Sequence, residues 1–190
     1  MVRAIIEGRK TQTRRIGKCQ MDSATELGVE YMGHATRGKV TVATYRAFPG
    51  AGTARWGLCE CPYGVPGDRL WVRETFAAPW GLDYKFPGGE SGILYRADNP
   101  KKFPDDGTWK PSIFMPRKAS RINLEIVSVS VERLCEISTA DAGAEGCNEP
   151  NPDGYNHAGF QYKKLWENIN GKGSWAKNPW VWVIEFKRIL

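Results

Sequence analysis

The chain of 190 residues is long enough for one well-buried core and short for two, so the sequence predicts a single domain over residues 1–190. Hydrophobic residues make up 41% of the chain, which is ordinary for a globular domain and argues against intrinsic disorder. The formal net charge of +6 suits phosphate-bearing partners, but many small enzymes are equally basic for solubility alone.

The start of the chain and its cysteines predict a cytoplasmic protein without a membrane partner. The segment MVRAIIEG is too short and too charged for a signal peptide, and no apolar run approaches the length that crosses a bilayer. The five cysteines are odd in number and lack the spacing of a disulfide framework, which is typical of reduced thiols; they are Cys19, Cys59, Cys61, Cys135 and Cys147.

The first part of the chain contains short predicted elements separated by polar segments. Residues 2–7 form a short helix that ends at Gly8, and the polar segment GRKTQTRR follows as a loop. The β-branched and aromatic residues at 39–48 predict a strand. A Pro-Gly turn at 66–68 leads into another strand at 70–72.

A loop insertion and one long strand follow. Glycine and proline are frequent at 77–119, which predicts a long loop with one short strand at 93–96. The segment RINLEIVSVSVERL at 121–134 is the clearest strand. Its apolar residues alternate in one phase up to Ile126 and in the other phase from Val127 onward. This switch predicts a bulge or bend, as a curled barrel strand needs.

Two helices and a closing strand are predicted in the last part of the chain. Ser138 as N-cap and Asp141 in the first turn predict a short helix that ends at Gly146. A second helix covers about 157–169 and places four apolar side chains near one face, namely Phe160, Leu165, Trp166 and Ile169. The apolar segment PWVWVIEFKRIL forms the last strand. This order predicts an α+β fold, a mixed and largely antiparallel β-barrel with peripheral α-helices.

Three segments spread over nearly the whole chain form a set. They are GRKTQTRR at 8–15, the turn and strand PGDRLWVRE at 66–74, and the helix ISTADAGAEG at 137–146, which is followed by the strand WVIEFKRI. Together they resemble the ASCH domain family, whose signature is Gly-x-Lys-Thr-x-Thr-x-Arg and whose fold is similar to that of PUA domains. The longer form with WKPSIFMPRKASRI at 109–122 is most similar to members found in phages and prophages. The resemblance implies a PUA-like barrel.

The resemblance implies two functions. Some ASCH proteins are thought to bind RNA, whereas others are amidohydrolases that remove acyl groups from the exocyclic amine of cytidine with a Lys, a Thr and a Glu. Lys10, Thr13 and Glu145 fill those three motif positions here. We therefore expect hydrolysis of N4-acylcytidine to cytidine and a carboxylate. The alternatives are a non-catalytic module that binds RNA or a modified base and, less favoured, a ribonuclease.

The three residue types suit amide cleavage, which needs a nucleophile, a base and an acid. Thr13 would supply the hydroxyl, and Glu145 would give a proton to the leaving amine. Lys10 acts as a base only if burial or its cationic neighbours Arg9, Arg14 and Arg15 lower its pKa. On general grounds Lys10 also fits a solvated lysine and Thr13 a capping hydroxyl. Glu145 precedes the glycine that ends its helix, where the helix dipole disfavours a carboxylate, and this favours a functional role.

Other residues are candidates for substrate binding. Arg15, the arginine that ends the signature, could hold a phosphate or polarise the scissile carbonyl, although a surface arginine paired with an acid fits equally well. Arg9 is a second cationic candidate in the same segment. Trp109, Phe114 and Arg117 interleave aromatic faces and positive charge, as a nucleotide-binding loop does. A lid packed on the barrel by its apolar residues explains the same composition.

No cofactor and no metal are expected. The Cys59-x-Cys61 spacing is wrong for a structural zinc knuckle, and no second cysteine pair accompanies it and His34. The expected partner is a small-molecule nucleoside or nucleobase, with RNA as the alternative. We expect a monomer or a weak dimer.

Overall fold

A computed structural model of the protein describes residues 1–17, 29–37, 40–47, 55–78, 81–83, 85, 92–98, 108–147 and 158–189. The helices are α1 (Val2–Ile6), α2 (Thr139–Ala144) and α3 (Ala158–Asn170), with short 3-10 helices at Ser112–Phe114, Arg117–Ala119 and Leu134–Glu136. The strands are β1 (Gln12–Ile16), β2 (Val29–Arg37), β3 (Val40–Ala47), β4 (Arg55–Glu60), β5 (Arg69–Trp71), β6 (Phe76–Ala77), β7 (Leu94–Tyr95), β8 (Asn123–Arg133) and β9 (Trp180–Ile189).

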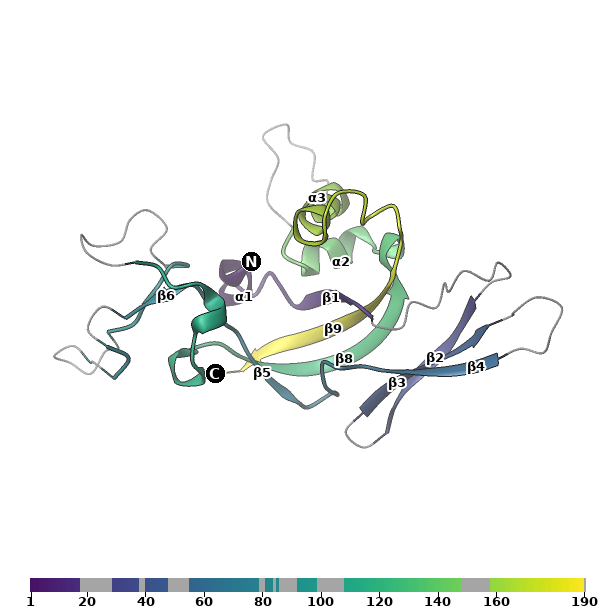
Figure 1. Ribbon diagram of the computed structural model, residues 1–190, viewed down its shortest axis with the longest axis horizontal. Coiled ribbons are helices and arrows are strands. Elements are labelled where there is room, and N and C mark those ends of the chain that lie inside the picture. Colours follow the sequence, from purple (N-terminus) through teal and green to yellow (C-terminus); the bar gives the residue numbers. More distant parts are fainter. Residues whose placement is uncertain are drawn as a thin grey trace.

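The main sheet is a curled antiparallel half-barrel. Its strand order is β1-β9-β8-β5, and each neighbouring pair is antiparallel. In Figure 1 the long strands β8 and β9 curve beneath α2 and α3, and β1 lies on the same side as α1. The expected α+β class and the largely antiparallel pairing are therefore confirmed.

The predicted change of phase in the long strand is a β-bulge. Ile126 pairs with Phe186 and Ser128 pairs with Glu185, so Val127 is an extra residue between two paired ones. Ile126 and Val129 are buried, whereas Val127 is 49% exposed. A bulge increases local twist and bends its strand. It therefore contributes to the curl of β8 in Figure 1.

Several elements differ from the sequence-based expectation. The segment after Gly8 was expected to be a loop but contains β1, which pairs with β9. A second sheet with the order β2-β3-β4 includes the expected strand at 39–48, but its outer strands were not predicted. The expected insertion at 77–119 contains β7 and two 3-10 helices, and β6 begins just before it. Much of the insertion lies outside the described residues.

Apolar side chains from β8 and β9 pack on both sides of the half-barrel. One cluster includes Val129, Trp182 and Ile184 on one side. The other side packs Val181 against Tyr162 and Trp166 of α3. The face predicted for this helix is wrong at two positions, because Phe160 and Ile169 are 68% and 63% exposed. The residues of α3 that are buried are Ala158, Tyr162 and Trp166.

The structure bears on two expectations, namely that the protein has no membrane partner and that its cysteines are reduced. Among the described residues, no helix is long and apolar enough to cross a membrane. Cys59 takes part in a disulfide, so the expectation that all five cysteines are reduced thiols is wrong for this residue. Cys61, Cys135 and Cys147 are free thiols.

Candidate active site

The site is built on β1, the outer strand of the half-barrel next to α2. Side chains alternate along a strand, so Lys10, Gln12 and Arg14 point to one side, and all three are buried. Gly8, with a φ of 74°, turns the chain from α1 into this segment. The Lys10 amide then donates to the Ala4 carbonyl at 2.9 Å, and the Thr11 amide donates to the Ala144 carbonyl at 2.8 Å. The first bond joins the segment to α1, and the second joins it to the end of α2, where Glu145 is located.

Lys10 and Glu145 form a buried ion pair. Lys10 Nζ lies 2.6 Å from Glu145 Oε2, and the two residues are 7% and 2% exposed. The same Nζ donates to the Gln12 carbonyl at 2.7 Å and to the Glu145 carbonyl at 3.0 Å. An ammonium group has three protons, so each one has an acceptor in this arrangement.

The pKa of Lys10 is lowered from its usual value. Burial is the main cause, because it disfavours the charged amine; Glu145 opposes the shift and Arg15 adds to it. Of the two causes considered from the sequence, burial is therefore the main one, and the cationic neighbour Arg15 is the lesser one. Arg9, one of the expected neighbours, instead forms an ion pair with Glu7.

Arg14 is part of the same buried network, a role that the sequence reasoning missed. Its Nε lies 2.6 Å from Glu132 Oε1, and its Nη1 lies 3.3 Å from Glu145 Oε1. Both carboxylate oxygens of Glu145 are therefore held by cations. Gln12 completes the network, since it accepts from Arg14 and donates to Asp141. Alternation from Lys10 along a strand would have placed Arg14 beside the pair.

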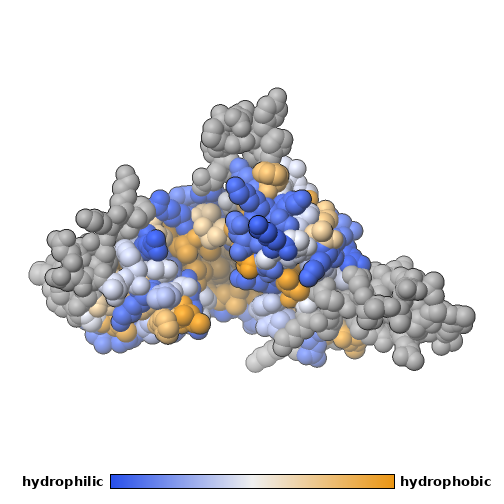
Figure 2. Space-filling model, turned by 45° about the horizontal axis from the view of Figure 1, so that its top comes forward, coloured by the Kyte–Doolittle hydropathy of each residue, from blue (hydrophilic) through white to orange (hydrophobic). Residues whose placement is uncertain are grey.

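A cavity of about 500 Å³ opens beside this network. Its polar lining includes Lys10, Thr13, Arg15 and Glu145, and Tyr162 of α3 also lines it. Apolar side chains from α1, α3 and the segment after β5 complete the wall, among them Val2, Ile5, Val72, Leu165 and Trp166. In Figure 2 the molecule is hollowed near its middle, with hydrophobic residues at the base of the hollow and hydrophilic residues around it. The size lies within the range of small-molecule sites.

Thr13 lines the cavity without touching the ion pair. It pairs with Ile184 of β9, and alternation turns its side chain to the opposite side of β1 from Lys10 and Arg14. In the part of the chain that the structure describes, the Thr13 hydroxyl makes no hydrogen bond to Lys10 or Glu145. The structure thus brings Lys10 and Glu145 into contact, and places Thr13 and Arg15 around the same cavity.

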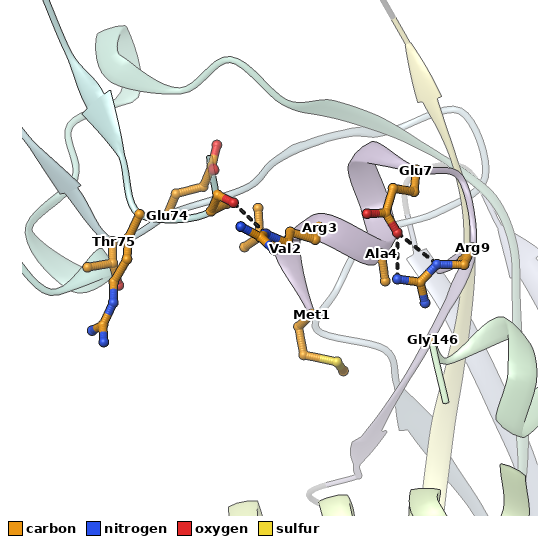
Figure 3. Close-up of a pocket in the computed structure, with 11 residues that line it drawn as sticks. Met1, Val2, Arg3, Ala4, Glu7, Arg9, Glu74, Thr75 and Gly146 are labelled. Carbon is orange, nitrogen blue, oxygen red and sulfur yellow. Dashed lines mark hydrogen bonds and ion pairs between the residues drawn. The ribbon is translucent and has the colours of Figure 1, made fainter. Parts of the chain in front are cut away.

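Arg9 lies in a different hollow, of about 410 Å³. Its Nε donates to Glu7 Oε2 at 2.8 Å, and Figure 3 shows the two side chains turned toward each other beside Gly146. Arg3 of α1 lines the same hollow and donates to the Ala97 carbonyl at 2.5 Å. The structure does not place Arg9 at the cavity of Lys10.

Trp109, Phe114 and Arg117 also lie apart from that cavity. Trp109 and Phe114 line a third hollow together with Phe76, and Phe114 is 68% exposed. Arg117 donates to Asn123 Oδ1 at 2.6 Å, and its guanidinium lies 5.8 Å from the centre of the Trp71 ring. Met115 and Ala119 of the same segment are buried in a cluster with Phe76 and Ile93.

The described residues contain no cluster of three or more His, Cys, Asp or Glu side chains that could hold a metal ion. His34 is exposed on β2 and pairs with Ala43, which in turn pairs with Cys59 on β4. These two candidate ligands therefore lie on the outer strands of the second sheet, with β3 between them.

Comparisons with family models, with curated proteins and with solved structures found no match to this chain. The assignment of function accordingly depends on the geometry of the cavity and on the residues of the sequence motifs.

Proposed function

We propose that the protein is an amidohydrolase of the ASCH type, with a PUA-like barrel, that converts N4-acylcytidines to cytidine and a carboxylate. The observation that carries the proposal is the buried contact of 2.6 Å between Lys10 Nζ and Glu145 Oε2 at the wall of a cavity. Two of the three motif positions are joined by it, and the third, Thr13, lines the same cavity.

The ion pair offers a base and an acid in one unit. Burial disfavours the charged Lys10 amine. Transfer of one proton from Lys10 to Glu145 would give an amine that can act as the base and a carboxylic acid that can act as the acid. Arg14 opposes this transfer, because it stabilises the carboxylate.

The proposed hydrolysis has a covalent route and a direct route. In the covalent route the Thr13 oxygen attacks the acyl carbon, and its proton passes to the Lys10 amine through one bridging water, because the Thr13 side chain lies on the opposite side of β1 from Lys10. The bond between the acyl carbon and N4 breaks, and N4 takes the proton of Glu145, so that cytidine leaves and an ester remains on Thr13. Water then hydrolyses the ester: its oxygen bonds to the acyl carbon, one of its protons restores the Thr13 hydroxyl, and the carboxylate and a proton are released. In the alternative route the Lys10 amine activates water directly, and Thr13 only positions the acyl group.

A second function has one specific observation in its favour. The three protons of a charged Lys10 all have acceptors, which is the arrangement of a structural ion pair. A non-catalytic module that binds RNA or a modified base would need nothing more from this pair. In that case the cavity would hold a base without reacting with it.

One pair of assays tests both functions. Purified protein is incubated with N4-acetylcytidine, and cytidine is measured by chromatography against a protein-free blank. RNA affinity is measured in parallel over a range of salt, because phosphate contacts weaken steeply as salt rises. Cytidine formation supports the hydrolase. Absence of cytidine together with tight, salt-sensitive RNA binding would show that the enzyme proposal is wrong.

A further inference from the structure

The cavity beside Lys10 carries an excess of positive charge. Four cationic side chains line it, namely Lys10, Arg14, Arg15 and Arg73, whereas Glu145 is the carboxylate in the lining among the described residues. Glu132 and Asp141 lie close to Arg14 and offset its charge from outside the lining. Arg15 and Arg73 therefore supply the excess.

Neither Arg15 nor Arg73 is in an ion pair in the described part of the chain. Arg15 lies on β1, and Arg73 follows β5, so the two arginines come from the two outer strands of the half-barrel. Both side chains are exposed at the cavity. Arg73 donates to the Ile113 carbonyl at 3.3 Å and lies 4.9 Å from the centre of the Trp71 ring. A guanidinium has five N–H donors, so most of those of Arg73 remain available to a ligand.

An uncharged acylcytidine has no anionic group that could pair with Arg15 and Arg73. Arginine forms short, bidentate hydrogen bonds with phosphate, and these are among the stronger polar contacts in proteins. A cavity of about 500 Å³ has room for a base, a ribose and one phosphate. We infer that the ligand of this cavity carries a phosphate, and that the substrate is an acylated cytidine monophosphate rather than the free nucleoside. The acyl group in this inference rests on the proposed function, whereas the phosphate is inferred from Arg15 and Arg73 alone.

The first experiment compares kcat/KM for N4-acetylcytidine with that for its 5′- and 3′-monophosphates at low salt. We expect one of the monophosphates to be preferred by about tenfold or more. Arg73→Gln and Arg15→Gln should each reduce this preference severalfold or more. Arg188→Gln is the matched control, because Arg188 is also exposed, donates to a backbone carbonyl at 3.3 Å and lies outside the cavity lining. It should leave the ratio unchanged.

Three results would overturn the inference. One is equal kcat/KM for the nucleoside and both monophosphates. Another is a preference that neither arginine variant reduces. The last is a short acylated RNA that is preferred more than tenfold over both mononucleotides, which would indicate a polymer substrate.

A binding experiment separates this inference from the proposed function. Calorimetry with cytidine and its two monophosphates needs no turnover. In one outcome no substrate is hydrolysed, but a monophosphate binds at least tenfold more tightly than cytidine and Arg73→Gln removes the difference. That outcome would support the phosphate site and contradict the proposed hydrolase. If acylcytidine is hydrolysed while cytidine and the monophosphates bind with equal affinity, the result supports the proposed hydrolase and contradicts the phosphate site.

Discussion

Lys10 Nζ and Glu145 Oε2 lie 2.6 Å apart although 135 positions separate the two residues in the sequence. Arg14 holds the other oxygen of Glu145 at 3.3 Å, so two cations share one buried carboxylate. The pair also joins β1 to the end of α2, because an isolated β-bridge connects the backbones of Lys10 and Glu145. Stability and the proposed chemistry therefore depend on the same contact.

A double-mutant cycle should separate these two roles. Glu145→Gln leaves Lys10 buried beside Arg14 without a carboxylate, and removal of one partner of a buried pair costs about 3–5 kcal/mol of unfolding free energy. Lys10→Met should cost less, because Arg14 still compensates Glu145. The double variant should be more stable than the sum of the single changes predicts, by 1 kcal/mol or more in urea unfolding, on the order expected of contacting residues. Additive costs would mean that the two side chains do not interact.

Activity should follow a different pattern in the same cycle. Each single variant lacks either the base or the acid, and the double variant lacks both, so none of the three should hydrolyse N4-acetylcytidine at a measurable rate. Recovery of stability without recovery of turnover would assign a chemical role to the pair. Turnover that recovers together with stability in the double variant would reduce the pair to a structural role.

Protonation of Asp141 should lower the unfolding free energy of the protein at acidic pH. Its pKa is lowered, mainly by the hydrogen bond from Ser138 and then by that from Gln12. The folded state therefore binds its proton less readily than the unfolded state does. The resulting stabilisation is present above the ordinary pKa of 3.8 and is lost as the pH falls through the lower folded value.

Asp141→Asn provides the measurement. The difference in unfolding free energy between the native protein and this variant should be constant near neutral pH, and it should shrink as the pH falls below 3.8. Urea unfolding at several pH values measures it. A difference that does not change with pH would contradict a lowered pKa at this position.

The sequence predicted the elements that depend on strong local patterns. The bulge at Val127 followed from a change in alternation, and the N-cap at Ser138 followed from residue type; the Asp141 amide donates to its hydroxyl. β1 was missed as a strand because its residues QTRRI are mostly polar. The alternation of buried and less buried positions does not show in the sequence, because the buried residues, Gln12 and Arg14, are themselves polar. Only the network with Glu132 and Glu145 explains why Arg14 is buried there.

The candidate site could be predicted only in part for the same reason. The motif positions of Lys10 and Glu145 were identified in the sequence, but their contact depends on how β1 and α2 pack, which no local pattern encodes. Arg9 and Arg15 looked equivalent in a polar segment. In the structure Arg15 lines the cavity, whereas Arg9 turns toward Glu7. Arg73 lies in the segment PGDRLWVRE, but nothing in that segment distinguished it as a cavity residue, because it comes close to Arg15 only in the folded half-barrel.

Substitutions of Thr13 distinguish a covalent intermediate from direct attack by water. Thr13→Ser keeps the hydroxyl and should retain measurable activity. Thr13→Val keeps the shape without the hydroxyl, and in the covalent route it should lose turnover by several orders of magnitude. If Thr13 only positions the substrate, the loss should be on the order of ten- to a hundredfold, as for one hydrogen bond. The rates of the native protein and the two variants on one acylcytidine distinguish the two routes. A Thr13→Val variant within a hundredfold of the native rate would exclude the covalent route.

The most direct test of the proposed chemistry is a time course of cytidine and acetate release from N4-acetylcytidine, or from whichever of its monophosphates is preferred, in the presence of EDTA. The native protein should form the two products in equal amounts over many turnovers, because Lys10, Thr13 and Glu145 need no metal in the proposed steps. Lys10→Met, shown by its circular dichroism to be folded, should form neither above the blank. Native protein that releases no product, or a folded Lys10→Met variant that turns over at the native rate, would contradict a hydrolase based on the Lys10–Glu145 pair.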